Sequence, residues 1–206
     1  MNPKQMVRSG YDKVSYAYRS RSFDYESSEY GRFVSSWLAS RLAPGSAVLD
    51  LGCGCGVPVS LVLSGDRKVT EIDISPVQIE RARRLVPDAE FICSDMTEAG
   101  FEPASFDAIV AFYSIIHIPL EEQPALLADI SRWLRPSGYL LASVGHGAWT
   151  GTEPDWCDIE GATMYWSHAD AATYRQWLME NGLSIIEEEF LPEGTGGHTI
   201  LLCRKM

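Results

Sequence analysis

The stretch of this sequence best suited to chemistry is a glycine turn that follows a buried strand. Between the apolar run 47–51 and the helix-compatible run 57–63, three glycines occupy alternate positions: Gly52, Gly54 and Gly56. A strand, a glycine turn and a helix in this order open a nucleotide-binding α/β unit, because glycine takes positive φ angles and leaves no Cβ between chain and ligand. Dinucleotide-binding turns carry their third glycine one position later and hold a pyrophosphate. Asp50, just before the turn, would repel a pyrophosphate and suits a cofactor that presents cationic groups.

A second carboxylate follows the next strand. The apolar run 69–74 predicts a strand that ends near Asp73, 23 residues after the first aspartate. A carboxylate at this place can accept hydrogen bonds from both hydroxyls of a ribose. The alternative is that Asp73 caps the next helix. However, Ser75, followed by Pro76 and Gln78, already forms a good N-cap with a capping box, so the ribose interpretation is favoured.

Two of the four histidines follow predicted strands at the edge where such sheets bind ligands. His117 comes after the fourth apolar strand, and His146 comes after the fifth. Either could act as a general base on a poorly nucleophilic acceptor. The alternative for each is a histidine that lines the cofactor site or holds the structure by hydrogen bonds. His168 lies inside a capping box, which favours a structural role, and His198 has no assigned role.

Aromatic residues gather in two segments that are expected to cover the ligand edge. The stretch 145–166 has no regular period and predicts a lid loop, since long loops in compact domains are usually functional. The cap segment 1–29 is rich in tyrosine. Together these segments predict a closable apolar pocket with substrate contacts from Tyr16, Tyr18, Trp149 and Trp166. Further aromatic residues of the two segments are Tyr11, Phe23, Trp156 and Tyr165. The alternative is that these rings anchor the lid to the sheet.

The hydrophobic pattern predicts one α/β domain over residues 1–206. A helix is expected over 30–42 and the first strand over 47–51, and the order that follows is β-α-β-α-β-β-α-β. Alternating strands and helices imply a parallel sheet with helices on both faces. Two final strands, over 183–190 and 199–203, are joined by a short connection and should pair antiparallel.

Composition excludes several function classes. The chain has 206 residues and a net charge of −11, which makes a poor surface for nucleic acid because phosphate contacts need clustered Lys and Arg. No apolar run approaches the ~18 residues that span a membrane. The first ten residues are polar and lack the apolar segment of a signal peptide, so a cytoplasmic location is expected. The five cysteines show no zinc spacing, and we expect reduced thiols and no metal.

Five motifs in order resemble those of the class I S-adenosylmethionine-dependent methyltransferases. They are Asp50-Leu51-Gly52-Cys53-Gly54-Cys55-Gly56, Ile72-Asp73-Ile74-Ser75, Ser94-Asp95-Met96, Phe106-Asp107-Ala108-Ile109-Val110 and Leu134-Arg135-Pro136-Ser137-Gly138. Each motif is weak by itself, but five at family spacing are specific. The resemblance implies a doubly wound, Rossmann-like seven-stranded sheet, mostly parallel with an antiparallel last strand. One departure is Glu71, where many relatives have glycine.

The resemblance also assigns cofactor contacts. Asp50 and the turn residues Gly52, Cys53, Gly54 and Gly56 would face the methionine end of S-adenosylmethionine. Asp73 would hold the ribose and Ile74 would pack on the adenine. Asp95 and Met96 would address the adenine edge, although a turn aspartate and a core methionine are the plain alternative. Phe112 would complete the cofactor site.

The function implied is methyl transfer to a small molecule, with oxygen slightly ahead of nitrogen or carbon as the acceptor atom. The segment after the fourth strand lacks the Asn/Asp-Pro-Pro-aromatic signature of base-amine methylation. One alternative is a macromolecular methyltransferase acting on RNA or protein, which would need a basic or extended docking surface. Another is a non-catalytic S-adenosylmethionine-binding partner subunit. An oxidoreductase is opposed by Asp50 and the glycine spacing.

Overall fold

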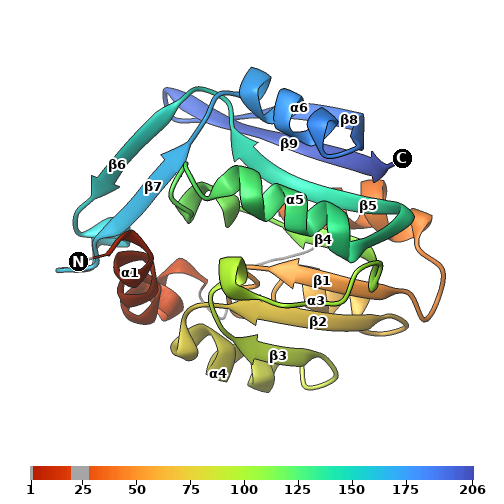
Figure 1. The fold of residues 1–206 in the computed structure, drawn as a ribbon. Helices are drawn as coiled ribbons and strands as arrows, with labels where there is room; N and C mark the ends of the chain where they lie inside the picture. The colour runs from red at the N-terminus through yellow and green to blue at the C-terminus, as the bar shows by residue number, and fades with distance from the viewer. Residues whose placement is uncertain (1, 20–27) are drawn as a thin grey trace.

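The computed structural model describes residues 2–19 and 28–206 and is built around a seven-stranded sheet (Figure 1). The strand order is β3-β2-β1-β4-β5-β9-β8. Strands β1 to β5 pair in parallel, and β9 runs antiparallel to both β5 and β8. The bounds are β1 (Ala47–Leu51), β2 (Lys68–Asp73), β3 (Glu90–Cys93), β4 (Phe106–Ala111), β5 (Leu134–Gly145), β8 (Leu183–Glu193) and β9 (Gly196–Lys205). The predicted fold class, with its antiparallel last strand, is confirmed.

Helices cover both faces of this sheet. One face carries α5 (Gln123–Trp133) and α6 (Ala171–Glu180), and the other carries α2 (Glu29–Phe33) and α3 (Val59–Leu63). Helix α4 (Pro76–Leu85) packs beside β2 and β3. Since both faces are buried, the central strands are apolar throughout, which is why they stood out in the sequence. None of the helices in the described part of the chain is long and apolar enough to cross a membrane.

The structure alters several predicted helix boundaries. The helix expected over 30–42 is α2 followed by a π-helical turn (Val34–Leu38) and a 3-10 turn (Ala39–Arg41). Ser75 caps α4 as predicted, since its hydroxyl accepts from the Gln78 N–H at 3.1 Å. Helix α6 is capped by Asp170, which accepts from the Thr173 N–H at 2.8 Å, rather than by Ser167. Short 3-10 turns follow β3 (η3, Met96–Glu98) and β4 (η4, Ile115–His117).

The segment 145–166 is not the irregular lid loop that the sequence predicted. It contains β6 (Trp149–Glu153) and the 3-10 turn η5 (Trp156–Asp158), and it leads into β7 (Met164–His168). Strands β6 and β7 pair antiparallel from Trp149–His168 to Glu153–Met164. This two-stranded ribbon reaches from the main sheet toward the N-terminal helix (Figure 1). It escaped prediction because its strands lack a regular apolar alternation.

The N-terminal helix α1 (Pro3–Tyr18) lies across the carboxyl ends of the parallel strands, while the C-terminus lies at the opposite end of the sheet (Figure 1). Asn2 caps this helix, since its side-chain oxygen accepts from the Lys4 N–H at 2.9 Å. The helix packs against β7, η4, η5 and α4. It thus covers the edge at which parallel α/β sheets bind ligands. Residues 20–27 of the cap segment, which include Phe23, lie outside the described residues.

Candidate active site

A cavity of about 930 Å³, including the part open to solvent, lies at the carboxyl edge of the sheet beneath α1. Its walls come from the glycine turn, from the segments that follow β2, β3 and β4, and from α1. Most of the predicted cofactor residues line it: Asp50, Gly52, Cys53, Gly54, Asp73, Ile74, Asp95, Met96 and Phe112. Residues far apart in sequence therefore converge on one cavity because parallel strands end at one edge.

The glycine turn approaches its neighbours too closely for a side chain. Gly52 has a φ of +79°, and a Cβ there would lie 2.4 Å from the Ser114 Cβ. The Gly52 and Cys53 N–H groups donate to the Ile72 carbonyl at 2.8 and 3.1 Å, which joins the turn to β2. Gly56 is not at the cavity. A Cβ there would lie 3.5 Å from Ala82, Val86 and Phe91, so Gly56 packs against these side chains and does not face a ligand.

Asp73 sits at the end of β2 with its carboxylate directed at the turn. It accepts from the Gly54 N–H at 2.9 Å and from the Ser75 N–H at 2.8 Å. Burial raises the pKa of Asp73 to about 6, although these two backbone donors act against the shift. A carboxylate has about four lone-pair sites, so acceptor capacity remains for a ligand in the cavity.

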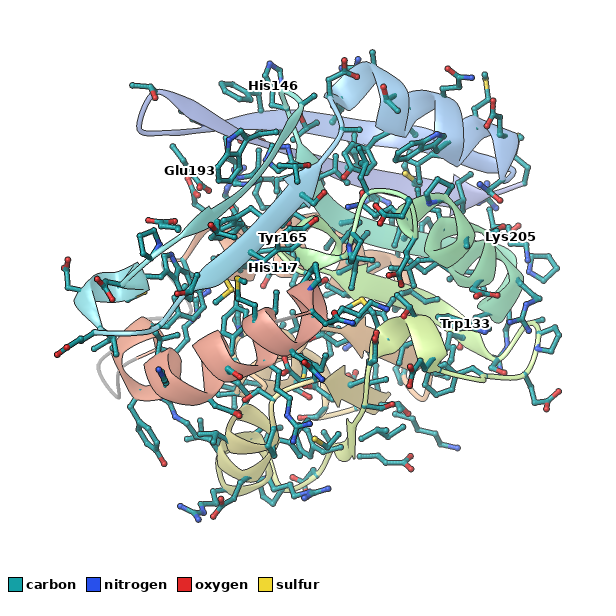
Figure 2. The ribbon with its side chains drawn as sticks, turned by 60° about the vertical axis from the view of Figure 1, so that its left-hand side comes forward. His117, Trp133, His146, Tyr165, Glu193 and Lys205 are labelled. Atoms are coloured by element: carbon teal, nitrogen blue, oxygen red, sulfur yellow. The ribbon has the colours of Figure 1, made fainter. Side chains whose placement is uncertain are left out.

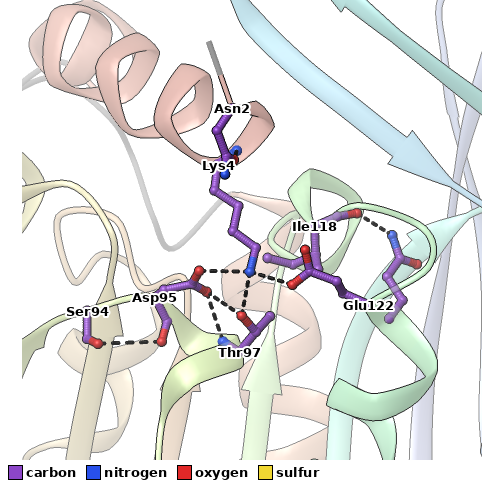
Figure 3. A network of polar contacts seen from close by, with 8 residues as sticks. Asn2, Lys4, Ser94, Asp95, Thr97, Ile118 and Glu122 are labelled. Carbon is purple, nitrogen blue, oxygen red and sulfur yellow. Dashed lines mark hydrogen bonds and ion pairs between the residues drawn. The ribbon is translucent and has the colours of Figure 1, made fainter.

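Asp95 begins the turn after β3 and takes part in a polar network with α1 (Figure 3). One of its oxygens accepts from the N–H and hydroxyl of Thr97, each at 2.9 Å. The other pairs with the Lys4 ammonium at 2.9 Å, and Lys4 also reaches Glu122 and the Thr97 hydroxyl. Burial alone would lower the pKa of Lys4, but Glu122 and Asp95 outweigh it and raise that pKa. Lys4 thus fixes the start of α1 beside the predicted adenine site.

His117 is buried at the opposite side of the cavity, where η4 meets α1 and the ribbon (Figure 2). Its Nδ1 lies 2.7 Å from the Tyr165 carbonyl, and its Nε2 lies 3.0 Å from the Tyr11 hydroxyl. Burial lowers the pKa of His117 to about 4, so the ring is neutral at pH 7. A carbonyl can only accept, so Nδ1 carries the hydrogen and Tyr11 donates to Nε2. The lone pairs of the Tyr11 hydroxyl are then available to a ligand in the cavity.

Aromatic rings from three segments form the rest of this wall. The Tyr30 ring lies 5.4 Å from Phe112 and 5.2 Å from Tyr113. The Arg19 guanidinium stacks over the rings of Tyr18 and Tyr30, at 4.4 and 4.7 Å from their centroids. All five residues line the cavity. The half of the cavity away from Asp95 is therefore largely aromatic, with one guanidinium among its tyrosines.

Tyr113 is held from outside the cavity by the tip of the C-terminal hairpin. Its φ of +49° is strained for an aromatic residue. Its hydroxyl donates to Glu193, whose other oxygen lies 3.2 Å from the His198 Nδ1. Tyr113 therefore lines the cavity while its hydroxyl donates outward to a carboxylate. The neighbouring His198 and Tyr113 lower the pKa of Glu193, which keeps the carboxylate ionised.

Several predicted catalytic and substrate residues do not reach the cavity. The His146 Nδ1 lies 3.1 Å from the Thr199 hydroxyl and its ring packs on Phe190, well away from His117 (Figure 2). Tyr16 is 59% exposed and Trp149 is 49% exposed. Trp166 packs on the His117 ring at 4.4 Å and supports it from behind. Tyr18 alone of the four predicted substrate contacts lines the cavity.

Sequence reasoning missed several residues that the fold brings to the site. They are Lys4, Arg19, Tyr30, Tyr113 and, at one remove, Glu193. Tyr11 was noticed only as one aromatic residue of the N-terminal segment. The helical spacing of Lys4, Val7, Tyr11 and Tyr18 is a signal that could have marked this face of α1, because such positions share one side of a helix. No local signal marks Glu193.

A family described as a methyltransferase domain matches residues 48–138 of this chain. The matched range runs from β1 to the start of β5 and contains the glycine turn, Asp73, Asp95 and His117. It therefore covers the cofactor motifs and the segment after β4, but neither α1 nor the two hairpins.

Two curated relatives illustrate the range of sequence similarity. Phosphoethanolamine N-methyltransferase 1 of Arabidopsis thaliana is 37% identical over 107 residues, which cover 50% of this chain and 21% of the relative. A carboxy-S-adenosyl-L-methionine synthase of Trichlorobacter lovleyi is 32% identical over 128 residues, which cover 55% of this chain and 52% of the relative. The chain spans about half or less of the length of these relatives.

Solved structures share the fold over almost the whole chain. Magnesium protoporphyrin IX methyltransferase of Synechocystis PCC 6803, solved with bound S-adenosylmethionine, has a TM-score of 0.76 at 19% identity, with 100% of this chain and 98% of that chain covered. The [4+2]-cyclase SpnF has a TM-score of 0.71 at 21% identity, with 97% and 96% covered. Since one of the two is described as a cyclase, the fold alone does not specify the reaction.

We expect the His117 imidazole to titrate near pH 4 and to carry its single hydrogen on Nδ1 at pH 7, because burial disfavours the imidazolium. NMR of the imidazole nitrogens across pH 3.5–8 measures both properties, with the His117 signals assigned from their loss in His117→Gln. A midpoint near the ordinary value of ~6.5, or a hydrogen on Nε2, would contradict the hydrogen-bond directions assigned to Tyr11 and Tyr165.

Proposed function

We propose that the chain is a class I S-adenosylmethionine-dependent methyltransferase and that it transfers a methyl group from S-adenosylmethionine to a small-molecule acceptor. The observation that carries the proposal is one continuous cavity with two chemically different halves. One half gathers the glycine turn, Asp73 and Asp95, and the other is an aromatic pocket closed by α1. A donor site and an acceptor site must adjoin in this way for a methyl group to pass directly between them.

The residues of the first half fit the proposed cofactor. Asp73 accepts the ribose hydroxyls, and Asp95 with Met96 receives the adenine edge. Asp50 and the glycine turn hold the methionine end. Three carboxylates, those of Asp50, Asp73 and Asp95, line this half, which suits a cofactor with an ammonium and a sulfonium better than one with a pyrophosphate.

S-adenosylmethionine supplies an already reactive methyl group, so the chain's own residues mainly position the acceptor and exclude water. Tyr11 offers hydroxyl lone pairs to the cavity, because its proton is directed to His117. It accepts a hydrogen bond from an acceptor that carries O–H or N–H and so turns the nucleophilic lone pair of that acceptor toward the donor. His117 acts through Tyr11, and His146 has no part in this arrangement.

The acceptor is an oxygen nucleophile, as the sequence analysis favoured, or a nitrogen nucleophile that carries hydrogen. Among similar proteins are a phosphoethanolamine N-methyltransferase and an O-methyltransferase of Pyrenophora dematioidea. The aromatic half lies beneath α1, which suits a small molecule. The net charge of −11 argues against a nucleic acid substrate.

The test of the proposed function is methyl transfer from isotopically labelled S-adenosylmethionine to a panel of phenols, hydroxy acids and amines, with products identified by mass spectrometry. We expect label in one compound class at a catalytic rate. Tight binding of S-adenosylhomocysteine without transfer to any compound, RNA or protein would favour a cofactor-binding partner subunit instead.

Removing the Asp73 carboxylate should cost most of the cofactor affinity. For Asp73→Ala we expect S-adenosylhomocysteine to bind on the order of a hundredfold more weakly, since hydrogen bonds to a charged group contribute about 1.5–3 kcal/mol each. Titration calorimetry measures the change, and circular dichroism checks that the fold is kept. Asp129→Ala, which removes an exposed partner of Arg132, is the matched control and should bind normally. Unchanged affinity in Asp73→Ala would refute the ribose assignment.

Removing the Tyr11 hydroxyl should slow transfer without weakening cofactor binding. For Tyr11→Phe we expect about a tenfold or greater loss of kcat/KM for the acceptor found in the panel, because one acceptor-orienting hydrogen bond is lost. Tyr16→Phe, on the exposed face of the same helix, is the matched control. Equal losses in the two variants, or none in Tyr11→Phe, would remove Tyr11 from the mechanism.

A further inference from the structure

Glu71 is a buried acid to which the proposed reaction gives no role. It lies in the middle of β2 and is 0% exposed, yet neither of its carboxylate oxygens has a hydrogen-bond partner among the described residues. The nearby Ser60 hydroxyl and Cys53 thiol face it and act to lower its pKa, but burial outweighs them. A buried carboxylate with so little compensation is destabilising, so its presence calls for an explanation in function.

The strand register places Glu71 directly beside Asp50. The two residues are partners in the β1–β2 pairing and point to the same face of the sheet, and Asp73 follows on that face two residues later. Asp50 is 3% exposed and lines the cavity, as do Cys53 and Asp73. Glu71 itself does not line the cavity, and its strand partner Asp50 lies between it and the cavity.

No cation balances these three carboxylates within the described part of the chain. None of the ion pairs there includes Asp50, Glu71 or Asp73. On the α1 side a fourth acid, Asp12, acts on Asp73, and Arg8 acts on the neighbouring Cys93 thiol. Arg19 and Arg81 approach the turn, where both act on the Cys55 thiol.

Two buried carboxylates side by side cannot both ionise without a countercharge. Burial raises the pKa of Glu71 to about 7, and burial together with Glu71 and Asp73 raises the pKa of Asp50. Below neutral pH the Asp50–Glu71 pair therefore retains a proton while the cavity is empty. A positive group placed beside Asp50 would supply the missing charge and expel that proton.

We propose that Glu71 is a positioning residue for the cofactor: acting through Asp50, it makes the glycine-turn end of the cavity require an ammonium-bearing ligand, whose binding displaces a proton from the Asp50–Glu71 pair to solvent. The charges balance because one ligand cation enters as one proton leaves: the O–H bond of the protonated carboxyl group breaks, its electron pair stays on the carboxylate, and the proton passes to solvent. The inference rests on the proposed function, which puts the methionine end of the cofactor at this turn.

The experiment compares two probes that differ only in the ammonium. They are S-adenosylhomocysteine and its desamino analogue, each titrated by calorimetry in two buffers of different ionisation enthalpy to count the protons released. The range pH 6.5–8 lies above the pKa of about 6 of Asp73 and that of about 4 of His117, so the Asp50–Glu71 pair dominates the linkage there. Cys53 stays protonated in this range because burial and the neighbouring acids raise its pKa.

For the natural chain we expect S-adenosylhomocysteine to release on the order of half a proton at pH 7 and to bind about fourfold more tightly at pH 8 than at pH 6.5, as a pKa of about 7 in the empty cavity requires. Binding tightens as the pH rises because a higher pH removes the proton that binding must otherwise displace. The desamino analogue should bind more weakly, release no proton and show no pH dependence over this range.

Glu71→Gln is nearly isosteric and removes the titration, so it should bind S-adenosylhomocysteine without proton release and with a flat pH profile. Glu80→Gln, in an exposed pair with Arg84, is the matched control and should behave like the natural chain. Glu71→Gly provides a second test if the glutamine variant folds poorly.

The outcomes separate the two proposals. No binding of S-adenosylhomocysteine to the natural chain would overturn the proposed function itself. Binding without proton release, or an unchanged pH profile in both Glu71 variants, would leave that function standing and overturn the role of Glu71. Equal proton release with the desamino analogue would likewise overturn it, since the ammonium would then not be the group that displaces the proton.

Discussion

The close approach of the glycine turn to the segment after β4 is the constraint on which the site depends. A side chain at Gly52 would collide with Ser114, and the turn's N–H groups are bonded to the end of β2. The ends of β1, β2 and β4 are thereby fixed relative to one another. Because Asp50 and Asp73 lie at the ends of β1 and β2, and His117 lies in η4 after β4, their relative positions follow from the backbone.

Helix α1 joins the two halves of the cavity into one enclosed site. Near its start Lys4 pairs with Asp95, in its middle Tyr11 donates to His117, and toward its end Ser15 bonds to Gln78 at 2.6 Å. The first contact belongs to the cofactor half and the second to the acceptor half. One helix therefore shields both from water, and the ribbon of β6 and β7 supports it through Tyr165 and Trp166. Enclosure of this kind favours reaction with the acceptor over loss of the methyl group to water.

The sequence was sufficient for the sheet and for bringing the carboxylates of the proposed cofactor half to one edge, because both depend on local patterns. Strand β1 matched its predicted range, Asp73 ends β2, and Asp95 follows β3. The acceptor half could not be predicted, since it depends on how α1 is rotated and where the hairpins dock. Tyr16 and Tyr18 are two residues apart on one helix, yet only Tyr18 faces the cavity. His146 follows β5 at the expected edge, but its side chain lies against Thr199 of the antiparallel neighbour β9.

The central claim is that the acidic glycine-turn cavity holds an S-adenosyl ligand. Parallel calorimetric titrations of the chain with S-adenosylhomocysteine and with NAD test it most directly. The account predicts one S-adenosylhomocysteine bound per chain and no binding of NAD, because Asp50 and the early third glycine exclude a pyrophosphate. Binding of NAD with no affinity for S-adenosylhomocysteine would contradict it.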